Sequence, residues 1–192
     1  MSSLIEQLKT RIKDPRQATE GADVIAPTIY PVASEASLHS AEQALGFALP
    51  QLLRQIYLEV GNGGFGPGYG LLGMAGGATD TGRNIIDLYH WFRQLDSDDP
   101  AWQWPAQLVP LCDLGCAMYA CIDCSTTAGA MTWFEPNPRE RGNPVHLFLI
   151  PVASSLEEWL RIWLGNQDWM GPAYVQSELY RILERWQNKD ES

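Results

Sequence analysis

Apolar residues recur every three or four positions in four segments of the first half of the chain. Such spacing places them on one face of a helix, and it predicts helices at about residues 4–12, 37–45, 50–60 and 84–95. Pro15, Gly46 and Gly61 are expected to end the first three. Pro50 is expected in the first turn of the third, where its missing N–H removes no hydrogen bond. The first half of the chain is therefore predicted to be mainly helical.

The middle of the chain changes to short apolar runs separated by turn-forming residues, a pattern typical of strands. The expected strands lie at 108–112, 117–123, 130–135 and 145–150. Their short connections predict an antiparallel meander. One further strand is expected near 69–72, directly after a turn in which six of the ten residues 61–70 are glycine.

Helical signals return after the strands. Ser154 with Glu157 and Ser155 with Glu158 are two overlapping capping-box patterns, which predict a helix start. This helix is expected to end at Gly165, and a last helix is expected at about 173–188. Helices followed by strands and then helices predict an α+β fold with a single mixed, largely antiparallel sheet flanked by helices.

Charge narrows the possible partners. Thirteen basic and twenty-three acidic side chains leave a formal net charge of −10. We expect no nucleic-acid or membrane partner, because both are bound through cationic side chains. A basic protein would be attracted and its association accelerated. The first residues lack the pattern of a secretory signal, and no apolar run is long enough to span a membrane. We therefore expect a cytoplasmic protein with reduced cysteines.

Four segments, in order, resemble the SUKH superfamily, which joins Smi/Knr-type fungal cell-wall regulators, the bacterial protein Syd and a viral family. They are a helix region at 42–57, the glycine-rich motif at 62–67, a hairpin at 110–124 and a helix start at 155–160. The resemblance covers residues 33–165. It leaves an N-terminal helix and linker at 1–32, and a C-terminal helical extension at 166–192 that is expected to pack on the same domain.

The resemblance implies a mixed sheet flanked by helices and no shared catalytic centre. Bacterial members are commonly immunity proteins that bind a protein toxin directly, whereas fungal members are regulatory interaction hubs. The motif residues are expected to be framework: Leu49, Pro50, Tyr57, Asn62, Gly63, Gly64, Gly66, Pro67 and Trp159.

Catalytic and metal-binding patterns are weak. Cys112, Cys116, Cys121 and Cys124 have a spacing that superficially suggests zinc, but cysteines on strands are more often buried apolar residues. The glycine-rich segment follows a helix and opens a strand, the wrong order for a phosphate site on a helix N-terminus. We expect no metal, cofactor or catalytic residue. An enzyme would require the convergence of four titratable residues in one pocket: Asp113, Asp123, Glu135 and His146.

The residues expected to bind a partner are acidic or aromatic. The acids are Asp80, Asp87, Asp96, Asp98 and Asp99, and they are joined by Trp102 and Trp104. Two loop tryptophans beside an acidic cluster would suit a protein interface, although they would equally suit a loop that covers the core. The sequence thus predicts an immunity protein, a monomer or weak homodimer, that occludes a basic toxin domain such as a nuclease. The alternative is a regulatory scaffold of the Smi/Knr type without a toxin partner.

Overall fold

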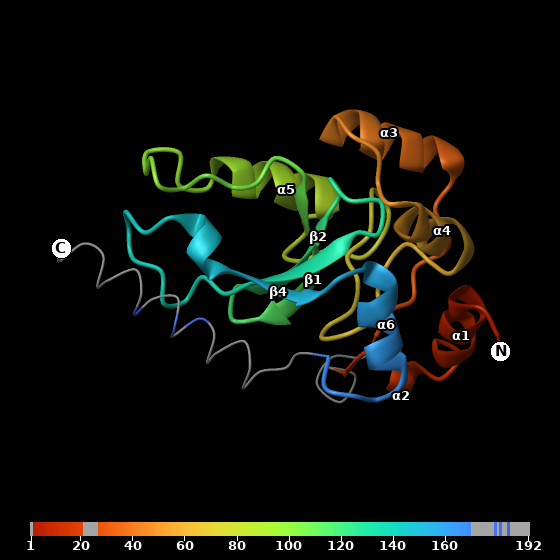
Figure 1. The fold of residues 1–192 in the computed structure, drawn as a ribbon. Helices are drawn as coiled ribbons and strands as arrows, with labels where there is room; N and C mark the ends of the chain where they lie inside the picture. Colours follow the sequence, from red (N-terminus) through yellow and green to blue (C-terminus); the bar gives the residue numbers. More distant parts are fainter. Residues whose placement is uncertain (1, 21–26, 170–178, 180, 182–183, 185–192) are drawn as a thin grey trace.

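The computed structural model describes residues 2–20, 27–169, 179, 181 and 184. Figure 1 shows how its elements are arranged. In chain order they are α1 (Leu4–Arg11), α2 (Pro15–Ala18), α3 (Glu35–Leu45), α4 (Gln51–Glu59), α5 (Ile85–Gln94), β1 (Leu108–Gly115), β2 (Met118–Asp123), β3 (Ala130–Phe134), the 3₁₀ turn η2 (Val145–Phe148), β4 (Leu149–Ala153) and α6 (Leu156–Leu164).

The starts of α1, α3, α4, α5 and α6 lie within two residues of the expected positions, and a side chain caps each of these helices except α4. Helix α2 was not expected, because Pro15 was interpreted as the end of the first helix and the start of a linker.

At α6, the hydroxyl of Ser155 accepts the backbone N–H of Glu158, but the Glu158 carboxylate accepts from Ser154 and not from the backbone of Ser155, so only half of this capping box forms. The other pattern does not, because the Glu157 carboxylate pairs instead with Arg161 one turn further on. Pro50 lies directly before α4 rather than inside its first turn. The start of α4 is therefore shifted by one residue, and the start of α6 follows the second of the two overlapping serine positions.

The four strands form one sheet in the order β1-β2-β3-β4, and every neighbouring pair is antiparallel. The α+β class and the meander are thereby confirmed. The last strand begins only at Leu149, because the preceding four residues form η2. A parallel bridge between Thr19 and Gly66 lies outside the sheet.

The expected strand at 69–72 is reduced to a single bridge between Leu71 and Cys112. Backbone hydrogen bonds from Tyr69 to Asp113 and from Leu72 to Leu111 flank this bridge. The segment therefore runs along the outer edge of β1 and satisfies backbone groups that an open edge would expose. Gly68 and Gly70, on either side of Tyr69, both have positive φ and interrupt the regular pairing that a strand needs.

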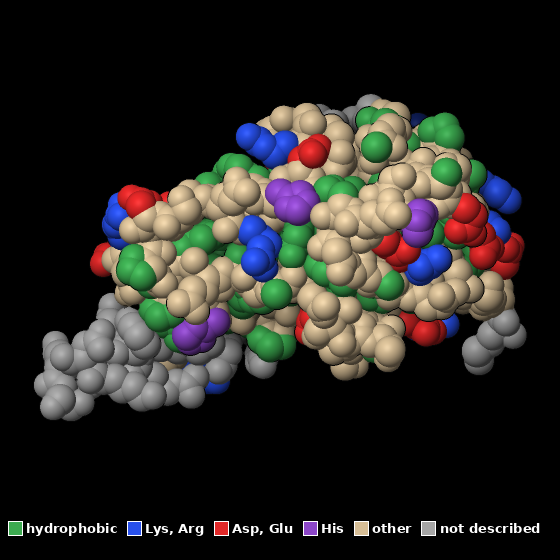
Figure 2. All heavy atoms as spheres, turned by 90° about the horizontal axis from the view of Figure 1, so that it is seen from above, with side chains coloured by type: hydrophobic (Ala, Val, Ile, Leu, Met, Phe, Trp, Pro, Cys, Tyr) green, Lys and Arg blue, Asp and Glu red, His purple; other side chains and the backbone are tan. Residues whose placement is uncertain are grey.

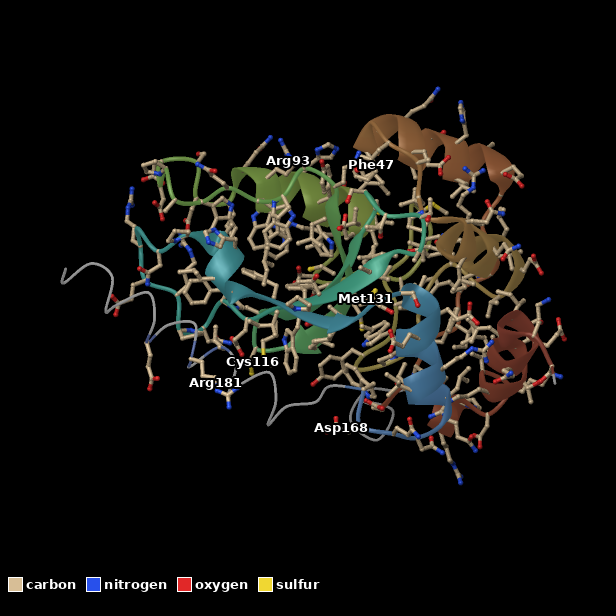
Figure 3. All side chains as sticks on the ribbon, viewed as in Figure 1. Phe47, Arg93, Cys116, Met131, Asp168 and Arg181 are labelled. Atoms are coloured by element: carbon tan, nitrogen blue, oxygen red, sulfur yellow. The ribbon has the colours of Figure 1, made fainter. Side chains whose placement is uncertain are left out.

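The helices surround the sheet unevenly. Helix α5 covers one face, with its closest contacts to β1, whereas α6 packs beside β3 and β4 (Figure 1). Figure 3 labels Phe47, which packs edge-on against Tyr89 of α5 with ring centroids 5.5 Å apart, and Met131 of β3, which is fully buried. Residue 47 thus links the α3–α4 connection to the helix that covers the sheet.

The N-terminal helix belongs to the same core. Leu4 and Leu8 of α1 are buried, and α1 packs against α4 and α6. The expected last helix at 173–188 lies outside the described residues except at three positions, of which Leu179 is buried in the same hydrophobic cluster. Within the described part of the chain, no helix combines the length and apolar character needed to cross a membrane.

Candidate functional site

The glycine-rich motif at 62–67 packs closely against neighbouring backbone inside the protein. Asn62 is buried, and its side-chain oxygen accepts the N–H of Met74 at 2.8 Å. A Cβ atom on Gly64, whose φ is +87°, would lie 1.8 Å from the carbonyl oxygen of Thr28, and one on Gly63 would lie 2.5 Å from another backbone oxygen. Backbone of the protein itself therefore occupies the space that a ligand would need beside these glycines.

The other expected framework residues are also interior. The hydroxyl of Tyr57 donates to the carbonyl oxygen of Leu72 at 2.7 Å inside the core. The carbonyl of Pro67 accepts from the thiol of Cys112 at 3.0 Å. The remaining buried motif residues are Leu49, Pro50, Gly66 and Trp159. None of these side chains is free to contact a partner.

The four cysteines are not gathered into one cluster. Cys112 and Cys121 are buried, Cys124 is half-buried and Cys116 is exposed at the turn between β1 and β2, where Figure 3 labels it. Burial raises the pKa of the Cys112 and Cys121 thiols well above the usual value, and raises that of Cys124 to about 12. Among the described residues, no group of three or more His, Cys, Asp or Glu side chains is arranged to hold a metal ion.

The four residues that an enzyme would need to bring together are spread over the sheet. Strand register pairs Asp113 with Tyr119 and Asp123 with Leu108, so the two acids lie at opposite ends of the hairpin. The carboxylate of Glu135 accepts from the backbone of Asn137. Asp123 and His146 line different surface hollows. This set of residues forms no shared pocket.

Trp102 and Trp104 lie in the core, so the alternative that they cover the core from a loop is the one the structure supports. Their exposed fractions are 9% and 6%. The indole N–H of Trp102 donates to the carbonyl of Phe92, and that of Trp104 donates to the carbonyl of Leu108. Both rings stack on the Phe92 ring of α5. The physical reason is that each indole finds an apolar surface and a buried acceptor at the same place.

The acidic cluster after α5 is partly neutralised by an arginine that the sequence did not single out. Arg139, from the β3–β4 connection, pairs with Asp96 at 3.1 Å and also with Asp99, and its guanidinium lies 4.9 Å from the centroid of the Trp102 ring. Asp99 is 4% exposed and accepts the backbone N–H groups of Ala101 and Gly142. These bonds, with Arg139, lower the pKa of Asp99 to about 2. Asp99 is therefore an internal anchor and not a contact residue.

The other four acids differ in how far they remain available. Asp96 keeps 45% of its side chain exposed, and Asp98 keeps 74% while pairing with the exposed Arg141. Asp87 is exposed and completes the capping box of Asn84 at the start of α5. Asp80 is half-buried and accepts the hydroxyl of Tyr119. The sequence located the acids, but their spacing could not reveal that Arg139 binds two of them, because about forty residues separate the partners.

These acids belong to the side of the molecule on which α3 and α5 lie. Figure 2 shows this face from above: acidic side chains are densest near α3, and a smaller group lies at the opposite end. Hydrophobic, histidine and Lys or Arg side chains lie between the two groups, and further Lys or Arg side chains lie beside the acids at both ends. The face therefore carries mixed charge around an apolar middle.

Comparison with known proteins gives a family. The model of the SMI1 / KNR4 family (SUKH-1) matches residues 32–162, which include α3 to α5, the whole sheet and most of α6. A search of curated proteins finds no match. The matched range begins one residue before and ends three residues before the range that the sequence pattern indicated. Because the match covers most of the chain, this protein belongs to the SMI1/KNR4 family (SUKH-1).

Proposed function

We propose that this protein is a cytoplasmic immunity protein, and not an enzyme, that neutralises a basic protein toxin by covering it. The observation that carries the proposal is a preformed acidic loop after α5. The buried pair of Arg139 and Asp99 holds this loop in place while Asp96 and Asp98 stay accessible. A surface that is ordered before binding loses little conformational entropy when the complex forms.

Charge supports a basic partner. The net charge of −10 favours association with a cationic surface and disfavours nucleic acid. Toxin domains that cleave nucleic acid carry such a surface, because their substrate is a polyanion. An acidic face that covers this surface would keep the substrate out. Inhibition would therefore require contact and charge complementarity, without chemistry by the inhibitor.

The test is co-expression with the toxin domain encoded beside the gene. We expect growth to be restored and a stable complex to elute as one species in size-exclusion chromatography. Asp98→Lys should weaken the complex about tenfold at low salt and less at high salt, because exposed charges are screened. The exposed Asp98–Arg141 pair adds little to stability, so this variant should remain folded.

Glu157→Lys is the matched control, since Glu157 is an exposed, ion-paired acid on α6 and its replacement changes the net charge equally. It should bind almost as well as the wild type. Equal losses for both variants would show that the loop is not the contact surface. Absence of a complex and of growth rescue would contradict the proposal and leave the regulatory scaffold as the better reading.

A further inference from the structure

A hollow on the sheet is lined by one carboxylate, that of Asp123 at the end of β2, and we call it the Asp123 hollow. It has a volume of about 430 Å³ and reaches from residues 105–108, where β1 begins, to Leu149 and Pro151 of β4. Among the described residues, no Lys, Arg or His side chain lines it. The hollow is therefore a negatively charged site with apolar walls.

Strand register places the hollow on the face of the sheet that α5 covers. Side chains alternate between the two faces of a strand, so Asp123 and Thr132 lie on the same face as Tyr119 and Phe134. The rings of these two aromatic residues pack edge-on against Phe92 of α5. Helix α5 thus covers the Tyr119 end of this face, and the hollow lies at the Asp123 end.

The polar groups in the hollow have hydrogen-bonding capacity that the protein does not use. Asp123 is half-buried, and no ion pair joins it to a cation in the described part of the chain. Its Oδ1 atom accepts the backbone N–H of Ser125 at 2.8 Å, which orients the carboxylate. The side chains of Gln107 and Thr132 also line the hollow, and within the described residues neither makes a hydrogen bond. Acceptor oxygens of three side chains are therefore available to a ligand.

Three other surface hollows in the described part of the chain differ in charge. One contains Arg141 and His146, and a second contains Arg139. A third contains Asp87, but that carboxylate completes the capping box at the start of α5. In the Asp123 hollow, the carboxylate has neither a neighbouring cation nor a helix end to stabilise it. Charge complementarity therefore selects a cation at this site.

We propose that the Asp123 hollow receives the cationic side chain of a lysine or arginine of the toxin. The inference rests on the proposed function and adds a specific contact to it. The aliphatic part of the side chain would lie against Leu149 and Pro151, because long basic side chains bury their methylene groups on apolar surface. The charged end would donate to the carboxylate of Asp123 and to the side-chain oxygens of Gln107 and Thr132.

The experiment measures Kd for the toxin domain encoded beside the gene by isothermal titration calorimetry. Asp123→Asn should raise Kd about tenfold or more, because the toxin cation loses its counter-charge. Its amide oxygen can still accept the N–H of Ser125, so the turn is kept. Gln107→Lys should raise Kd by a similar factor with Asp123 unchanged, because the new ammonium group would occupy the hollow.

Glu59→Gln is the matched control, since Glu59 is an exposed acid on α4 that does not line the hollow. All three variants make the net charge less negative by one. The control should bind within about twofold of the wild type, because an exposed ion-paired acid contributes little. Melting temperatures establish that every variant is folded.

Alanine substitution of each lysine and arginine of the toxin locates the partner of Asp123. One such variant should raise Kd for the wild type and raise it little further for Asp123→Asn, because both changes remove the same interaction. If every substitution is additive with Asp123→Asn, no toxin cation lies in the hollow and the inference is wrong.

Two further results would overturn the inference while the proposed function stands. One is that Asp123→Asn and Gln107→Lys both bind the toxin within twofold of the wild type. The other concerns a free organic cation, since the hollow also has the size of a small-molecule site. If NMR titration shows that agmatine binds the wild type but not Asp123→Asn, and toxin affinity is the same for both, the hollow serves a small cation. If the wild type does not bind the toxin, the proposed function fails and the inference fails with it.

Discussion

At the scale of single residues, the glycine-rich motif is a device for close backbone approach. Gly64 lies against the carbonyl of Thr28, in a space that would not admit the Cβ atom of any other residue. The buried Asn62 bonds the next loop through its side chain at Met74 and Ala75. Such interactions join three segments without a regular strand. The motif therefore holds the loop in which one residue bridges to β1, and it carries no chemistry of its own.

Replacing Gly64 by alanine should destabilise the protein by about 3 kcal/mol or more, because a backbone atom must move to admit the Cβ. Gly76 has a similar positive φ, but a Cβ there would meet nothing within 4 Å. Gly76→Ala should therefore cost only the backbone strain, about 1 kcal/mol. Urea unfolding of both variants measures the difference. Equal losses would show that the close approach at residue 64 is not what requires glycine.

At the scale of elements, Arg11 joins the first helix to the last described one. Its guanidinium donates to the carbonyl of Leu164 and to the side chain of Asn166, and it lies 4.2 Å from the ring centroid of Trp163. A third hydrogen bond reaches Gln17. Helix α1, which precedes the residues that match the family, is thereby attached to the C-terminal end of α6.

Arg11→Ala should lower the free energy of unfolding by about 1 to 3 kcal/mol, because the carbonyl groups of Leu164 and Gln17 lose a charged donor and the Trp163 ring loses its stacked guanidinium. Lysine should not restore this loss, since a point charge cannot make three hydrogen bonds in the plane of a guanidinium. Arg16→Ala is the control: its side chain is exposed, and a change within about 0.5 kcal/mol is expected. Chemical denaturation monitored by circular dichroism gives these values. A loss for Arg11→Ala no larger than for the control would contradict the role of Arg11.

At the scale of the whole molecule, the excess of acids is used in two ways. Asp99 and Arg139 join the loop after α5 to the β3–β4 connection inside the protein. Exposed acids such as Asp98 remain outside and set the character of the surface. The negative net charge is therefore not evenly available to a partner. Internal pairs order the loop, and the outer carboxylates remain exposed.

The internal pair predicts sensitivity to acid. The pKa of Asp99 is lowered to about 2, whereas an unfolded chain has an Asp pKa of about 3.9. The unfolded state therefore takes up the proton first, so the stability that Asp99 contributes is complete above about pH 4 and is lost as the pH falls towards 2. Asp99→Asn should have a lower Tm than the wild type at neutral pH, and the gap should narrow between pH 4 and 2.

Thermal unfolding followed across this pH range checks the prediction. Asp98→Asn serves as the control, since its carboxylate is exposed and its pair with Arg141 is worth little in water. Its Tm should stay close to that of the wild type at every pH. A gap between Asp99→Asn and the wild type that stays constant from pH 7 to pH 2 would show that ionisation of Asp99 does not stabilise the fold.

Local patterns in the sequence determined the five longer helices that the structure describes, the meander and most element ends, but not the single-turn helix α2 in the expected linker. Caps, glycine stops and alternating apolar positions act within a few residues, so the sequence displays them directly. The family motif also followed from the order of its segments. The expected strand at 69–72 is instead a single bridge, because its pairing depends on how closely this glycine-containing segment approaches the edge of β1.

Only the tertiary structure decided which surface is available for binding. Trp102 and Trp104 became core because Phe92 and two backbone acceptors lie where the chain folds back. Asp99 became an anchor because Arg139, forty positions away, reaches it, and Trp91 and Leu95 stayed partly exposed. Contacts of this kind depend on distances between remote segments, and the spacing of residues along one chain carries no record of those distances.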